Sequence, residues 1–158
     1  MRILVVEDDP LQSDSLLKVL KRSFANVRFD PILKSEAAFC FAIDQIFSDP
    51  PDIILIDVML RWTEKRGSDA PVPPALVDEE GYYRAGIRCQ RLAAEFEKKT
   101  GKTIPIVLLT ILDAGTLRKD TSALPPHVAH VKKEADPIEL IAKIRELVTG
   151  NSSTVPVY

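Results

Sequence analysis

Short apolar runs alternate along this chain with longer stretches in which apolar residues recur every three or four positions. The short runs predict buried strands; they cover residues 3–6, 27–33, 53–56, 104–110 and 128–132. The longer stretches predict amphipathic helices; they cover residues 10–24, 36–47, 82–99, 112–124 and 137–150. Because strands and helices alternate, the pattern predicts an α/β fold, with a parallel sheet covered by helices on both faces. Pro31 places the second strand at an edge of that sheet.

Two segments depart from this pattern. Residues 61–80 are charged, rich in proline and glycine, and without periodicity, which predicts a loop inserted after the third strand. A loop of this length is either functional or disordered, so it is either a solvated insertion without a role or a lid or partner-recognition element. In the second case Trp62 would be an anchor for the partner. Residues 150–158 predict a flexible tail or the start of a linker, which leaves one domain over residues 1–149.

Composition excludes several classes of protein. The chain has 158 residues and a net charge of −2, which indicates no general affinity for nucleic acid or for anionic membranes. Cys40 and Cys89 lie within apolar helical patterns, so we expect reduced core residues rather than a disulfide framework or a metal cluster. The N-terminus reaches acidic residues too soon for a signal peptide, and no apolar run is long enough to span a membrane. We therefore expect a cytoplasmic protein.

Residues with charged or hydroxyl side chains lie at the ends of four predicted strands. Glu7 and Asp8 follow the first strand, Asp57 the third, Thr110 ends the fourth, and Lys133 follows the fifth. Because the carboxyl ends of parallel strands share one edge of the sheet, these side chains can meet there. Three crowded carboxylates repel one another unless a cation lies among them, and Mg²⁺ prefers such oxygen ligands. A lysine and a hydroxyl opposite it would bind phosphoryl oxygens, with a carboxylate as the nucleophile. Asp57 alone would equally fit a carboxylate that caps the following loop.

Four motifs in this order resemble the receiver domain of bacterial two-component response regulators. They are VVEDDP at residues 5–10, ILIDVML at 54–60, LLT at 108–110 and KEADPIEL at 133–140. The resemblance extends from residue 2 to about residue 148. It implies a flavodoxin-like (βα)5 fold, a doubly wound parallel sheet with strand order 2-1-3-4-5, and a site between the first and third strands.

The resemblance also implies how the acidic residues act. Asp57 takes a phosphoryl group from a phosphohistidine on a sensor histidine kinase or a phosphotransfer protein. Asp8 and Asp57 ligate Mg²⁺ directly, Glu7 helps to hold it through water, and the backbone carbonyl of Met59 is the remaining protein ligand.

Other roles implied by the resemblance belong to the fourth and fifth strands. Thr110 donates a hydrogen bond to a phosphoryl oxygen, and Lys133 pairs with the phosphoryl group. Lys132 is the alternative for this pairing, but the residues that follow Lys133 match the start of the family's last helix. His130 occupies the place of the family's switch aromatic and would move together with Thr110. The alternative is a surface histidine without a role.

The function that the resemblance implies is a phospho-accepting switch in phosphorelay signal transduction. Such a domain catalyses only its own phosphorylation and a slow autodephosphorylation. Phosphorylation would change contacts of the face formed by the fourth helix, fifth strand and fifth helix. The partner is a downstream protein, an effector domain or a second copy, and the domain itself binds no nucleic acid. The alternative is a non-phosphorylated interaction module, whereas Met59 argues against an aspartyl-nucleophile phosphatase, which requires a second aspartate there.

Two substitutions depart from the family's pattern near the site. Arg61 stands where the family usually has proline, and Ile111 where it usually has a small residue after the threonine. A bulky Ile111 would narrow the pocket and slow both phosphorylation and hydrolysis. Together with the insertion, these departures argue mildly for the non-phosphorylated module, whereas the intact set of site residues argues against it: Glu7, Asp8, Asp57, Thr110 and Lys133.

Overall fold

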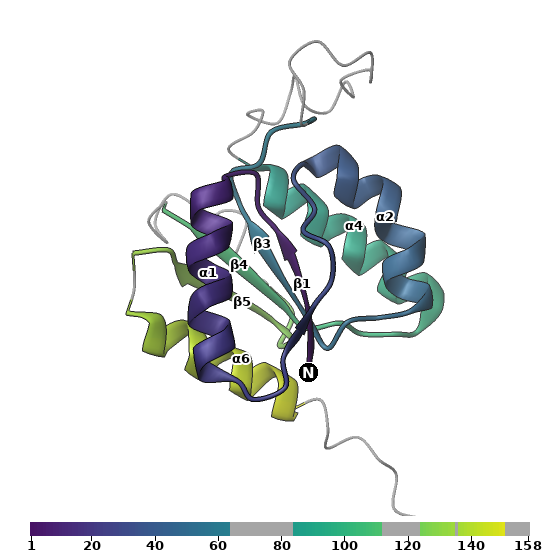
Figure 1. Cartoon of the computed structure of the whole chain (residues 1–158). Helices are drawn as coiled ribbons and strands as arrows, with labels where there is room; N and C mark the ends of the chain where they lie inside the picture. Colours follow the sequence, from purple (N-terminus) through teal and green to yellow (C-terminus); the bar gives the residue numbers. More distant parts are fainter. Residues whose placement is uncertain (64–83, 112–123, 135, 151–158) are drawn as a thin grey trace, which may run out of the picture.

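The computed structural model describes residues 1–63, 84–111, 124–134 and 136–150 (Figure 1). Most of the insertion predicted over residues 61–80 lies outside the described residues. The same holds for the helix predicted over residues 112–124, except Leu124, and for the tail beyond residue 150.

A five-stranded parallel sheet forms the centre of the molecule, with strand order β2-β1-β3-β4-β5. Its strands are β1 (Arg2–Val6), β2 (Arg28–Phe29), β3 (Ile53–Asp57), β4 (Ile106–Thr110) and β5 (Val128–Lys132). The order reverses between β1 and β3, so the predicted doubly wound, flavodoxin-like sheet is confirmed. In sheets of this kind the crevice for ligands lies at that reversal.

Within the described residues, two helices cover each face of the sheet (Figure 1). They are α1 (Pro10–Ser23) and α6 (Pro137–Gly150) on one face, and α2 (Glu36–Ser48) and α4 (Ala85–Thr100) on the other. Side chains of β1 alternate between the faces: Ile3 and Val5 pack toward α1 and α6, whereas Leu4 and Val6 pack toward α2 and α4. Because both faces are buried, the central strands β1, β3 and β4 carry runs of successive apolar residues rather than apolar residues at every second position.

Capping residues set the helix ends close to the predicted positions. The Asp9 side chain accepts hydrogen bonds from the backbone N–H groups of Leu11 and Gln12 and so begins α1. Ser35 does the same for α2 through the N–H of Ala38. Such caps satisfy backbone donors that the first helical turn leaves without partners. Helix α4 ends at Gly101, whose φ of 69° a glycine adopts without strain.

The second strand is shorter than the pattern predicted. Only Arg28–Phe29 pairs with β1, and Leu33 adds an isolated bridge to Val6. Pro31 lies between them and has no N–H group to donate, so the ladder is interrupted there. The edge position of this strand is confirmed, since β2 pairs with β1 alone.

The two cysteines are free thiols on the helices of one face. Cys89 is buried and Cys40 is half-buried, and burial raises the pKa of both. Among the described residues, none of the helices has the length and apolar character needed to cross a bilayer.

Candidate active site at the carboxyl edge of the sheet

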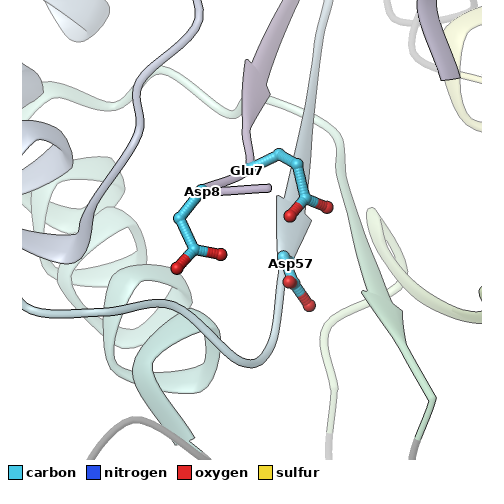
Figure 2. Close-up of side chains that lie close together, drawn as sticks. All are labelled: Glu7, Asp8 and Asp57. Atoms are coloured by element: carbon cyan, nitrogen blue, oxygen red, sulfur yellow. The ribbon is translucent and has the colours of Figure 1, made fainter. Parts of the chain in front are cut away.

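Three carboxyl groups meet where the strand order reverses. Glu7 follows β1 and Asp57 ends β3, and these strands pair so that Val6 lies beside Ile56. One oxygen each of Glu7, Asp8 and Asp57 lies within 4.8 Å of the other two (Figure 2). Glu7 and Asp57 are only 3% and 5% exposed. The structure thus concentrates negative charge in a place that is largely shielded from water.

A lysine enters this cluster from β5. The Lys133 ammonium lies 2.7 Å from Glu7 Oε2 and 2.8 Å from Asp57 Oδ2. It also donates a hydrogen bond to the side-chain oxygen of Gln12 on α1. The backbone N–H of Lys133 continues the β4–β5 ladder by donating to Thr110 O at 2.8 Å. The strand ladder therefore fixes the backbone of Lys133, and the side chain reaches the acidic cluster from there.

The electrostatics of the site follow from this burial. Burial raises the pKa of Asp57, and the bonds from Lys133 oppose the rise without cancelling it. Burial together with the charge of Asp57 raises the pKa of Glu7 to about 6. Burial lowers the pKa of Lys133, but its bonds with Asp57 and Glu7 outweigh this effect, so the net shift is upward. Lys133 thus remains an ammonium group at neutral pH, and the carboxylates outnumber it.

Of the other predicted site residues, Met59 contacts Asp57 directly, whereas Thr110 and His130 are placed by their strands. The backbone N–H of Met59 donates a hydrogen bond to Asp57 Oδ1 at 3.0 Å and orients the carboxylate. Thr110 is fully buried at the end of β4, in register with Lys132 on β5. His130 lies within β5 and is half-buried, and burial lowers its pKa.

Arg61 contacts the acidic cluster in a way that the sequence analysis missed. Its Nε lies 2.7 Å from Asp8 Oδ2, and its backbone N–H donates to the same oxygen at 3.4 Å. The sequence singled out Arg61 only as a departure from a family pattern. A lone cation four residues beyond Asp57 was the available signal, but spacing alone does not indicate which carboxylate it would meet.

Gly86 is a second residue that the sequence analysis missed. Its backbone N–H donates to Val58 O at 3.0 Å, which joins the start of α4 to the end of β3. A Cβ atom at this position would lie only 2.3 Å from the backbone oxygen of Asp57. The absence of a side chain therefore lets α4 begin directly against the residue that carries the central carboxylate. A glycine inside a helical pattern was the available signal for such a close approach.

The acidic cluster fits a hard divalent cation. Two oxygens bound to one Mg²⁺ are at most about 4.2 Å apart, twice the usual Mg–O distance. Oxygens within 4.8 Å of one another could therefore hold one such cation between them. The residues present therefore match the chemistry that Mg²⁺ requires.

Comparisons with known proteins agree on the fold. No protein-family model and no curated protein matches the sequence. Among solved structures, the N-terminal domain of a response regulator/sensory box/GGDEF three-domain protein from Carboxydothermus hydrogenoformans is 21% identical, with a TM-score of 0.61 and coverage of 99% of this chain and 100% of that one. The signal receiver domain of a histidine kinase from Syntrophus aciditrophicus is 20% identical, with a TM-score of 0.62 and coverage of 99% and 96%. A response regulator receiver protein from Pseudoalteromonas atlantica is 18% identical, with a TM-score of 0.59 and coverage of 96% and 99%.

Two of these structures are described as a signal receiver domain and as a response regulator receiver protein. The TM-scores of all three structures, 0.59 to 0.62, show that they share the overall fold of this chain. The chain therefore has the fold of response-regulator receiver domains.

Proposed function

We propose that this chain is a signalling receiver that accepts a phosphoryl group on Asp57 in a Mg²⁺-dependent reaction. The donor is a phosphohistidine on a sensor histidine kinase or a phosphotransfer protein. The observation that carries the proposal is the placement of Lys133 Nζ 2.8 Å from Asp57, within a cluster that also contains Glu7 and Asp8. An ammonium group beside a nucleophilic carboxylate is suited to bind a phosphoryl group.

Asp57 is the nucleophile of the proposed transfer. One of its oxygens attacks phosphorus, an O–P bond forms, and the N–P bond of the phosphohistidine breaks. The bonding electrons remain on the histidine nitrogen, which takes up a proton. Lys133 stays protonated throughout and neutralises charge on the phosphoryl oxygens, while the Met59 N–H keeps the carboxylate oriented.

Mg²⁺, when bound, neutralises the negative charge that gathers between phosphoryl group and carboxylates. Asp8, Asp57 and the carbonyl of Met59 would hold it, with Glu7 acting through water. The Thr110 hydroxyl, at the end of the neighbouring strand, would donate a hydrogen bond to a phosphoryl oxygen.

The consequence of phosphorylation in this proposal is a change in protein contacts. A phosphoryl group on Asp57 favours one of two states of the surface that includes β5 and α6. His130 on β5 and Thr110 on β4 would form the link between site and surface. The output partner is then a downstream protein, an effector domain or a second copy of the chain.

Intact mass after incubation with acetyl phosphate tests the proposal. We expect the wild-type chain to gain one phosphoryl group, about 80 Da, only when Mg²⁺ is present. The gain should vanish in Asp57→Asn. It should persist in Asp44→Asn, a matched control on the exposed side of α2. A gain that persists in Asp57→Asn would place the phosphoryl group elsewhere and contradict the proposal.

A non-phosphorylated interaction module remains the second candidate function. The ion pair between Arg61 and Asp8 favours it, because a guanidinium already neutralises one of the expected metal ligands. Lack of a mass gain with acetyl phosphate and with phosphorylated histidine kinases would support this second function.

A further inference from the structure

The Arg61 guanidinium occupies one corner of the acidic cluster. Both its Nε and its backbone N–H are directed at a single oxygen, Oδ2 of Asp8. Asp8 is also one of the three residues whose oxygens form the group suited to a cation. A guanidinium and a divalent cation therefore face the same carboxylate.

The backbone of Arg61 is held in place independently of its side chain. Its carbonyl accepts a hydrogen bond from Glu36 N at 3.0 Å, and the Trp62 carbonyl accepts one from Ala37 N at 2.9 Å. These are the first N–H groups of α2, which find no partner within the helix. The start of α2 thus keeps Arg61 at the rim of the site, whichever direction its side chain takes.

The side chain itself is free to leave the site at little cost. Arg61 is 55% exposed, so its guanidinium can return to water without a large solvation change, whereas Asp8 is 16% exposed. Ion pairs with such exposure are weak and easily exchanged. The contact can therefore yield to a cation that binds the carboxylates more strongly.

We infer that Arg61 is a built-in competitor for the divalent cation, which neutralises Asp8 when the metal is absent and lowers the affinity of the site. This inference rests on the proposed function for the identity of the cation. A cation at Oδ2 of Asp8 displaces the guanidinium. A cation at the other oxygen binds a carboxylate whose charge is already partly neutralised. In both cases Arg61 weakens binding, so the site fills only at higher Mg²⁺ concentrations.

Calorimetric titration with Mg²⁺ alone tests this role without any phosphorylation. Arg61→Met removes the charge and keeps much of the side-chain length. We expect it to bind Mg²⁺ about threefold to tenfold more tightly than wild type, as expected for loss of a nearby exposed charge. Arg61→Lys keeps the charge and should stay within about twofold of wild type. Arg28→Met, an exposed arginine at the amino end of the sheet, is the matched control and should also stay within that range.

Fluorescence of Trp62, the single tryptophan of the chain, provides a second readout beside Arg61. Its change on adding Mg²⁺ should have its midpoint at lower concentration in Arg61→Met, in step with calorimetry. Equal affinities for wild type and Arg61→Met would overturn the inference and leave the proposed function intact. Lack of Mg²⁺ binding in both proteins would overturn the metal site, and with it both the inference and the proposed function.

Discussion

Two groups of buried charge in this molecule are built in opposite ways. Between α2 and α4, Arg88 meets Glu36 through two bonds, Nε to Oε1 at 2.7 Å and Nη2 to Oε2 at 2.8 Å. At the carboxyl edge of the sheet, Lys133 faces both Glu7 and Asp57. In the first group a guanidinium meets a carboxylate in the bidentate geometry that suits both partners. The second has more carboxylates than ammonium groups.

This difference separates a structural contact from a candidate functional one. The paired group joins two helices on one face of the sheet, and both its side chains are nearly inaccessible to water, at 12% and 5% exposure. In the sheet-edge group burial raises the pKa of both Asp57 and Glu7, which means that the folded chain is made less stable by their ionisation. A surplus of charge that costs stability is typical of a site kept for a ligand.

Breaking the matched pair should produce the largest effect on stability. Arg88→Met leaves Glu36 buried without its cation, so we expect the free energy of unfolding to fall by about 3 kcal/mol. Urea unfolding at pH 7 measures this change. The double variant Glu36→Gln with Arg88→Met removes both charges and should recover most of the loss. A loss below about 1 kcal/mol in the single variant would show that the pair behaves like an exposed one.

Adding one methyl group at Gly86, on α4, should displace the backbone that carries Asp57. The Cβ of Gly86→Ala would collide with the backbone oxygen of Asp57, so α4 or the end of β3 must shift. We expect a loss of about 2 kcal/mol, as for overpacked cores, and slower phosphorylation of Asp57. Urea unfolding and the rate of mass gain with acetyl phosphate measure the two effects.

Gly150→Ala is the matched control, because a Cβ there has no atom of another described element within 4 Å. Its stability should be close to that of wild type. If Gly86→Ala were as stable as this control, the close approach of α4 to Asp57 would not be required.

Removing one surplus charge should stabilise the metal-free chain. The pKa of Glu7 rises from 4.5 to about 6 on folding, so its contribution to stability is present below pH 4.5 and is lost as the pH rises through 6. Glu7→Gln mimics the protonated form. We expect it to be more stable than wild type by about 1 kcal/mol at pH 7.5, after allowance for screening by water, with the gain vanishing near pH 4.5.

Thermal unfolding at several pH values checks this dependence. With saturating Mg²⁺, wild type should be more stable than Glu7→Gln, because the metal neutralises the surplus negative charge to which Glu7 contributes. A variant that is less stable than wild type at pH 7.5 without Mg²⁺ would show that the bond with Lys133 outweighs the cost of the charge.

The smallest expected effect concerns the neighbour of Thr110. Ile111 follows β4 and is 51% exposed. If its bulk restricts water at the phosphoryl group, Ile111→Ala should shorten the lifetime of phosphorylated Asp57 by about threefold. The decay of the added mass over time measures the lifetime. Phe41→Ala, which changes an exposed apolar side chain on α2, should leave it unchanged, and an unchanged lifetime in Ile111→Ala would contradict the prediction.

The apolar pattern of the sequence predicted the strands best where apolar runs are unbroken. The runs that contain Val5, Leu55 and Val107 became fully buried strands, because a strand covered on both faces must be apolar at successive positions. The second strand was predicted too long, since apolar residues on both sides of Pro31 resemble a continuous run although proline interrupts the ladder. Polar residues at strand ends indicated the site because parallel strands end at one edge.

Tertiary structure alone decided which charges meet and how closely. Arg61 and Asp8 are 53 positions apart, and Glu36 and Arg88 are 52 apart. Hydrophobic periodicity determines which face of each element is buried, but a contact between element ends depends on how strands and helices come together in space. The same is true of Gly86, whose role arises only where α4 begins against β3. The sequence by itself thus determined the layers of the fold and the edge where chemistry is placed, whereas long-range packing decided how that edge is charged.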